Sequence, residues 1–214
     1  LSGSTLKYEY EGTNLVRFTD ADGSVTEYVY DAQGRMTEWY DALGYCQVKN
    51  TYDEKGRVVR QTDANGGENS LEYFDDHTVT TDALGNVSEV WFDQLKRTVK
   101  TVDALGWVTG YAYDAAGHII AKTDAAGAKT TYEYDAAGNK IRETAPDGTS
   151  YAFTYDESHN VTTCTDQLGN VTQYAYDEHN RLTAETAPDG GVTRYAYNEA
   201  GQVLRITDPL GGVW

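Results

Sequence analysis

The stretch Thr109 to Thr130, TGYAYDAAGHIIAKTDAAGAKT, is one unit of a repeat that recurs through nearly the whole chain. Two tyrosines separated by one residue lead into Asp114, which opens a DxxG tetrapeptide ending at Gly117. A short mixed segment follows, and a second DxxG, Asp124 to Gly127, closes the unit. Because repeats make length a poor guide to domain number, the repeat is the first feature to define.

The repeat has a nearly constant length. The Asp that follows the aromatic pair recurs every 21 residues from Asp93 to Asp177, and the glycine of the second DxxG keeps this interval from Gly85 onward. Units before residue 85 are irregular, and the unit at Asp75 is three residues short. We therefore expect residues 1–214 to form a single repeat domain of about ten units, with no separate domains.

Each unit predicts two strands and two turns. A Tyr-x-Tyr pair has the period of a strand and places both rings on one face. In DxxG, Asp suits the first position of a type I turn, and Gly suits the left-handed position that follows it. The residue before the first turn is aromatic in every unit: Tyr10, Tyr30, Tyr52, Phe74, Phe92, Tyr113, Tyr134, Tyr155, Tyr176 and Tyr197.

The turn geometry also predicts a register. If each anchor Asp pairs with the residue four positions later, the preceding tyrosine faces the residue five positions after that Asp. The expected pairs are Tyr30 with Met36, Tyr52 with Val58, Tyr113 with Ile119, Tyr155 with Val161, and Tyr176 with Leu182. An odd repeat length would place successive tyrosines on alternating faces of the sheet. We therefore expect one correction in each unit, either a second turn that pairs differently by one residue or an additional β-bulge.

These elements predict an all-β fold, a continuous antiparallel β-meander of about ten 21-residue units and about twenty strands. Open twisted sheets seldom exceed about ten strands without curling. We expect this ribbon to curl into part of a large hollow barrel or spiral shell. The expected structural repeat positions are Tyr30, Asp31, Gly34, Tyr52, Asp53, Gly56, Tyr113, Asp114, Gly117, Asp124, Gly127, Tyr134, Asp135, Gly138, Tyr155, Asp156, Tyr176, Asp177, Tyr197 and Gly201.

Charge and hydropathy exclude several classes of partner. The formal net charge of −17 is scattered along the chain, so a nucleic-acid backbone would be repelled. No apolar run is long enough for membrane insertion, and no signal peptide is recognisable.

Cys46 and Cys164 are unmatched and favour a thiol-tolerant compartment such as the bacterial cytosol. Since the chain starts at Leu1 without Met and stops soon after a turn, we expect a fragment of a longer protein.

The sequence predicts no catalytic residue, no metal site and no cofactor. Nearly all aspartates stand at the first position of a turn, where backbone capping explains them. Asp20, Asp22 and Gly23 imitate part of a calcium loop, but the remaining ligands are missing. Histidines occupy unrelated positions, and the tryptophans do not form the periodic cages of a carbohydrate- or choline-binding adhesin.

The pattern YxYDxxG(R/N) followed by TDxxG resembles the YD repeats of the RHS (rearrangement hot spot) family. It is matched by YVYDAQGRMTEWYDALG (Tyr28 to Gly44), YAYDAAGHIIAKTDAAG (Tyr111 to Gly127) and YAYDEHNRLTAETAPDG (Tyr174 to Gly190). The resemblance covers essentially the whole chain. The family's autoproteolytic aspartate site and DPxGL pattern are absent, because Asp208 to Gly211 falls in the ordinary second-turn column.

The resemblance implies a structural role without enzymatic activity. Members form β-shells that enclose a C-terminal toxin, as in bacterial Rhs effectors, some delivered by type VI secretion, and in C-type proteins of the insecticidal toxin complexes; teneurins of animal cell surfaces carry similar shells. The implied partners are the rest of the parent chain and its toxin, which would lie outside this segment. Such a protein would be cytoplasmic before export and then secreted or surface-delivered. The alternative is cell-surface adhesion or carbohydrate binding. Either way, unpaired terminal strand edges predict self-association or partial disorder at the ends.

Overall fold

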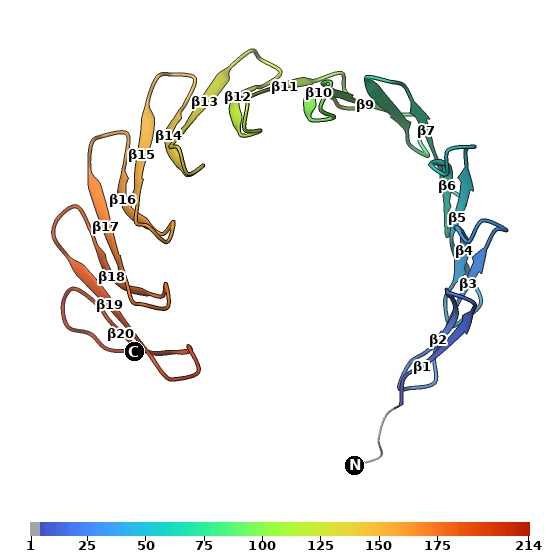
Figure 1. Ribbon diagram of the computed structural model, residues 1–214, viewed down its shortest axis with the longest axis horizontal. Helices are drawn as coiled ribbons and strands as arrows, with labels where there is room; N and C mark the ends of the chain where they lie inside the picture. The colour runs from blue at the N-terminus through green and yellow to red at the C-terminus, as the bar shows by residue number, and fades with distance from the viewer. Residues whose placement is uncertain (1–4) are drawn as a thin grey trace. The chain divides into compact units, whose positions relative to one another are not determined.

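The computed structural model describes residues 5–214 and divides at Val108 into two compact units. The part of the chain that it describes contains twenty strands and no helix (Figure 1). The predicted all-β antiparallel fold is therefore confirmed. The four N-terminal residues, part of the end for which disorder was expected, lie outside the described residues.

The first unit, up to Val108, contains ten strands, β1 to β10, and each strand from β1 to β9 pairs antiparallel with the next. Its strands are β1 (Lys7–Glu11), β2 (Asn14–Thr19), β3 (Val25–Tyr30), β4 (Met36–Tyr40), β5 (Cys46–Tyr52), β6 (Val58–Asp63), β7 (Glu68–Tyr73), β8 (His77–Thr81), β9 (Val87–Phe92) and β10 (Thr98–Val102).

The second unit begins at Thr109, inside β11, and its strands follow the same antiparallel order. Its strands are β11 (Val108–Tyr113), β12 (Ile119–Thr123), β13 (Lys129–Tyr134), β14 (Lys140–Thr144), β15 (Ser150–Tyr155), β16 (Val161–Thr165), β17 (Val171–Tyr176), β18 (Leu182–Thr186), β19 (Val192–Tyr197) and β20 (Val203–Thr207). Within this unit the strands from β13 to β20 follow a curve (Figure 1).

The DxxG segments form the predicted turns. At the first turn of one unit, Gly34 N donates to Asp31 O at 3.0 Å, and Asp31 N donates to Arg35 O at 2.9 Å. Asp31 Oδ1 accepts from the backbone N–H groups of Gln33 and Arg35 at 2.9 and 3.0 Å. Gly34 has a φ of 76°, the left-handed conformation in which glycine costs least.

The predicted cross-strand register is confirmed. Tyr30 faces Met36, Tyr52 faces Val58, Tyr113 faces Ile119, Tyr155 faces Val161 and Tyr176 faces Leu182. These five aromatic–aliphatic pairs close the first hairpins of their repeats and contribute roughly 0.2–1 kcal/mol each in such settings.

Of the two predicted ways to correct the parity, the structure contains the additional β-bulge. Tyr134 faces Lys140 but Glu133 faces Arg142, so Ile141 has no residue opposite it. The second turns of the regular units show no such shift. The bulged residues are Val16, Thr37, Val59, Val99, Ile120, Ile141, Thr162, Thr183 and Leu204. One bulge in each regular repeat therefore keeps the tyrosines on one face of the sheet.

The irregular units compensate for their length in different ways. A second bulge, between Trp39 and Tyr40, absorbs one extra residue in the early part of the chain. In the short unit a tight turn joins Phe74 to His77, and the hairpin has no bulge. The sequence assignment of Phe74 to the aromatic column is wrong here: Tyr73 closes the hairpin opposite Thr78 and takes that place.

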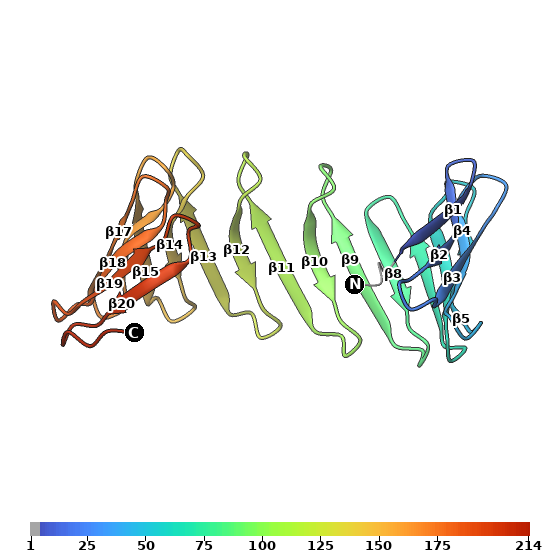
Figure 2. The ribbon, with the colours of Figure 1, turned by 90° about the horizontal axis from the view of Figure 1, so that it is seen from below.

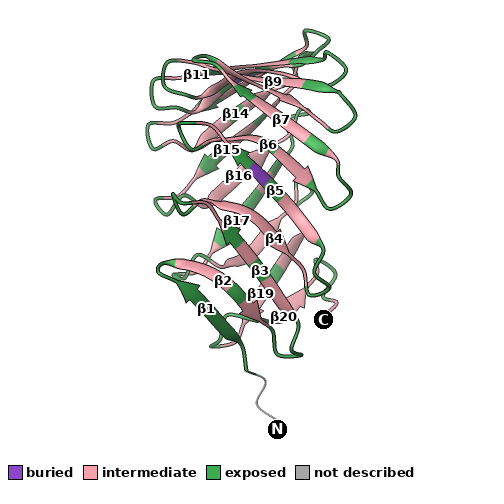
Figure 3. Cartoon of the chain, turned by 90° about the vertical axis from the view of Figure 1, so that its right-hand side faces the viewer, coloured by how far each residue is buried: buried purple, intermediate pink, exposed green. Residues whose placement is uncertain are grey.

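The sheet has almost no core. Among residues 5–214 the only buried side chains are Ala121 and Asn50, which are 6% and 8% exposed. All the other described residues are half-buried or exposed (Figure 3). A single sheet layer has no second layer to cover it. The sheet is therefore stabilised by contacts between neighbouring repeats.

Candidate functional site

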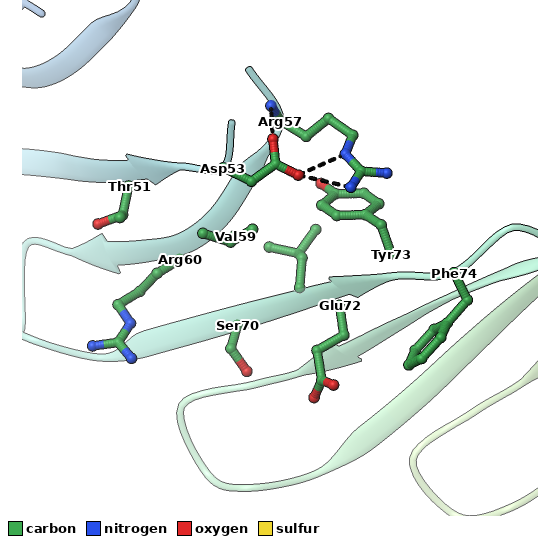
Figure 4. Close-up of a pocket in the computed structure, with 10 residues that line it drawn as sticks. Thr51, Asp53, Arg57, Val59, Arg60, Ser70, Glu72, Tyr73 and Phe74 are labelled. Atoms are coloured by element: carbon green, nitrogen blue, oxygen red, sulfur yellow. Dashed lines mark hydrogen bonds and ion pairs between the residues drawn. The ribbon is translucent and has the colours of Figure 1, made fainter. Parts of the chain in front are cut away.

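The contacts that join one repeat unit to the next recur at the first-turn end of the strands. The clearest example, which we call the inter-repeat link, consists of Asp53, Arg57, Val58 and Tyr73. Figure 4 shows Asp53, Arg57 and Tyr73 of this link. Asp53 and Arg57 belong to the turn between β5 and β6, and Tyr73 ends β7. The link therefore connects a turn to the tyrosine of the following unit.

Asp53 uses its two carboxylate oxygens differently. Oδ1 accepts from the backbone N–H groups of Lys55 and Arg57, both at 2.9 Å. Oδ2 accepts from Arg57 Nε at 2.8 Å and lies 2.7 Å from Arg57 Nη2. The N–H of Arg57 and the other donors hold the pKa of Asp53 below its usual range, so this carboxylate is charged and fully engaged in its own turn.

The held guanidinium covers the next tyrosine. Arg57 Cζ lies 4.2 Å from the centroid of the Tyr73 ring, a cation–π geometry. The Tyr73 hydroxyl donates to Val58 O at 2.8 Å. Val58 precedes the bulge and lies outside the paired part of β6 and β7, so the hydroxyl satisfies a carbonyl that the ladder does not reach.

The same hydroxyl bond recurs in both compact units, each time to a carbonyl 15 or 16 positions earlier. It joins Tyr30 to Leu15 at 2.9 Å, Tyr52 to Met36 at 2.5 Å, Tyr134 to Ile119 at 3.0 Å, Tyr155 to Lys140 at 2.7 Å and Tyr197 to Leu182 at 2.8 Å. Burial raises the pKa of Tyr134, Tyr155 and Tyr176, consistent with this half-buried position.

The residue that covers the ring varies. Arg35 lies over Tyr52 at 4.6 Å and Arg181 over Tyr197 at 4.9 Å. In another unit His118 replaces arginine: its Nδ1 lies 2.9 Å from Asp114 Oδ2, and its ring stacks on Tyr134 at 4.6 Å. Elsewhere asparagine occupies this position, and Asn139 Nδ2 donates to Asp135 Oδ2 at 2.9 Å.

The expected structural positions fall into three roles in this arrangement. The anchor aspartates cap the first turns, the preceding tyrosines end the strands, and the glycines take positive φ values from 76° at Gly34 to 98° at Gly117. Asp124 and Gly127 form a second turn, where Asp124 Oδ1 accepts from the N–H groups of Ala126 and Ala128 at 2.9 Å. The covering residue after the glycine was visible in the motif as Arg or Asn, but sequence reasoning gave it no role.

The arrangement offers little for catalysis or metal binding. The link carboxylates are already bonded to donors of their own turns, and the residues that the structure describes contain no group of three His, Cys, Asp or Glu side chains that could hold a metal ion. Cys46 and Cys164 are free thiols. Over the same described residues, no helix is long and apolar enough to cross a membrane. What the links provide is a mechanical connection between successive repeats.

Comparison with solved structures gives the same fold at low sequence identity. The chain resembles a crystal structure of TcdB2-TccC3 without its hypervariable C-terminal region, with a TM-score of 0.52 and 15% identity over 91% of this chain and 15% of that one. A TcdB2-TccC3-Cdc42 structure matches equally, at a TM-score of 0.52.

Sequence comparison identifies the repeat. The chain is 35% identical over 95 residues to a protein of Dickeya dadantii (strain 3937) named probable deoxyribonuclease RhsA, covering 42% of this chain and 7% of that relative. The RHS Repeat family model matches residues 8–45, 92–129, 113–150, 155–192 and 176–213, which is well over half of the chain. With its linked hairpins, regular turns and these matches, the chain belongs to the RHS repeat family.

Proposed function

We propose that this chain is a non-enzymatic wall segment of a β-shell that encloses a toxin domain located outside it. The observation that carries the proposal is the nearly coreless single-layer sheet, whose units are joined by repeated links. A shell wall needs a continuous sheet whose two faces are both exposed to solvent, whereas an enzyme needs a preorganised pocket. The chain spans only 7% of the Rhs relative and 15% of the TccC3-containing chain, which leaves room for cargo elsewhere in such proteins.

The proposed mechanism is sequestration. A continuous sheet keeps an enclosed domain away from the cell that makes it until the parent protein is exported, by type VI secretion or another route. We propose that the twenty strands act as one repeat domain, since the 21-residue spacing of Gly85, Gly106 and Gly127 runs through Val108 without interruption. The net charge of −17 would suit a basic cargo, such as a nuclease.

Limited proteolysis of the full parent protein tests the proposal. The enclosed domain should survive protease concentrations that digest it when it is produced alone. The Tyr134→Ala and Tyr155→Ala substitutions remove two of the links between repeats. This local opening of the wall should make the enclosed domain accessible to the protease. Equal digestion of the free and the parent-borne domain would contradict encapsulation, and binding of the isolated chain on a glycan array would favour adhesion instead.

A further inference from the structure

One link between repeats carries a histidine where other links carry arginine or asparagine. The position directly after the first turn, which the covering residue occupies, holds Arg35, Arg57, Arg97, His118, Asn139, Asn160 and Arg181. Arginine stays charged and asparagine stays neutral, whereas histidine changes its charge between about pH 5 and 8. Among these covering residues, His118 is therefore the one whose charge depends on pH in this range.

His118 lies between its own turn and the following repeat. Its turn joins β11 to β12, and β12 pairs with β13 on its other side (Figure 2). His118 Nδ1 lies 2.9 Å from Asp114 Oδ2, and the imidazole stacks on the Tyr134 ring with 4.6 Å between the ring centroids. The other edge of the imidazole faces the next first turn, since a methyl group on Gly138 would lie 3.0 Å from His118 Nε2. The side chain is thus held by groups of both repeats, although 34% of it is exposed.

The surroundings of His118 favour a positive charge. The titratable groups that line the same groove come from its own turn, from β13 and from the turn after β13: Asp114, Tyr132, Glu133, Tyr134 and Asp135. On β14, the Lys140 ammonium lies 2.6 Å from Glu143 Oε2, so its charge is compensated within that strand. The hydrogen bond from His118 holds the pKa of Asp114 below its usual range, so Asp114 is a carboxylate when His118 gains its proton.

We propose that His118 makes this link a pH-dependent connection between two repeats, strong when the imidazole is protonated and weaker when it is neutral. Protonated His118 forms an ion pair with Asp114 and places a cation over Tyr134, as Arg57 does over Tyr73 at 4.2 Å. Neutral His118 retains one hydrogen bond to Asp114, as Asn139 does to Asp135 at 2.9 Å, but it loses the charge.

The direction of the response follows from which form the folded chain favours. The contacts of His118 favour its protonated form, so the stabilisation is present at acid pH and is lost as the pH rises through the range in which histidine releases its proton. The Tyr134 hydroxyl donates to Ile119 O at 3.0 Å, so the ring that His118 covers also connects β13 to β12. A weakened link should therefore allow β12 and β13 to open more often, whether or not the chain encloses another domain.

Hydrogen–deuterium exchange of the full chain at about pH 6 and about pH 8 tests the proposal, with each amide rate divided into the rate of an unstructured amide at that pH. In the unmodified chain, the amides of β12 and β13 should be about threefold better protected at the lower pH, as expected for a partly exposed cation–π contact and ion pair.

The variants use residues that occupy the same position in other repeats. H118R should show the higher protection at both pH values, because arginine keeps its charge. H118N should show the lower protection at both, because asparagine has none. The matched control is H179N, which removes a histidine with a 64% exposed side chain from the turn of a later repeat. It should retain the threefold difference in β12 and β13.

Three results would overturn the proposal. The first is equal protection of β12 and β13 at both pH values in the unmodified chain. The second is a pH difference that survives in H118N or in H118R. The third is loss of the difference in H179N as well as in H118N, since that result would assign the response to the charge of the whole chain.

Discussion

The tyrosine before the first turn connects two repeats through one hydroxyl group. In the compact unit that begins at Thr109, Tyr155 closes its own hairpin opposite Val161, and its hydroxyl donates to Lys140 O at 2.7 Å. Lys140 adjoins a bulge and lies outside the paired residues of β14 and β15. The aromatic ring and the hydroxyl thus serve different strands, which explains why tyrosine suits this position better than phenylalanine.

The substitution Tyr155→Phe should destabilise the chain by about 0.5–1.5 kcal/mol, because it leaves the Lys140 carbonyl without its partner but retains the ring. Urea unfolding followed by circular dichroism measures the change. Tyr151→Phe is the control, since this more exposed tyrosine lies on the same strand and face. Equal effects of the two substitutions would rule out a specific role for the hydroxyl bond.

At the scale of the strand, the bulge determines which face each side chain occupies. Ile141 is the unopposed residue of its hairpin. Because of this extra residue, the next tyrosine along the chain lies on the same face of the sheet as the tyrosine before the bulge. The short unit has no bulge in its first hairpin because its tight turn already supplies the required parity. Turn length and bulge are therefore alternative solutions to the same constraint.

Deleting Ile141 should be far more disruptive than deleting a whole unit, residues 135–155. The single deletion moves every later side chain to the opposite face, whereas the 21-residue deletion preserves parity and rejoins Tyr134 to Asp156. Circular dichroism and urea unfolding should show a weakened, broadened transition for the first and a cooperative one for the second. A cooperative transition for the single deletion would show that the bulge is dispensable.

Local chemistry made the turns, the hairpin register and the need for a bulge predictable from sequence. Asp and Gly at fixed offsets specify the turn, and the turn specifies that Tyr113 faces Ile119. The assignment of Phe74 to the aromatic column failed because the short repeat changes turn type, which the aromatic spacing does not reveal. The inter-repeat link was not predicted, since a contact such as Tyr73 to Val58 depends on how neighbouring hairpins lie.

Across the whole molecule, many carboxylates depend on turn hydrogen bonds. Side-chain or backbone donors lower the pKa of Asp31, Asp53, Asp135 and Asp156 from the ordinary value of 3.8. Their lowered folded-state pKa favours the folded chain above the unfolded pKa, and this stabilisation is lost as pH falls through the folded values. The loss of stability at acid pH therefore depends on the hydrogen bonds that these carboxylates make in their turns.

The urea midpoint should stay constant between about pH 6 and 5 and should fall as the pH drops below about 4. Measurement at about 0.5 M NaCl screens the general repulsion of an acidic chain. The variant D135N/D156N should show a shallower fall, because Asn can cap the same turn: Asn198 Oδ1 accepts from Gln202 N at 2.9 Å. An unchanged slope in this variant would show that these carboxylates do not control acid stability.

The near absence of a core also has a thermal consequence. The heat-capacity increase of unfolding, ordinarily about 12–15 cal/mol/K per residue, arises mainly from newly hydrated apolar surface. With only Ala121 and Asn50 buried among the described residues, unfolding hydrates less new surface than in a layered domain of this length. The free energy of unfolding should therefore change little with temperature, which gives this chain a broad, shallow stability curve and a low temperature of cold denaturation.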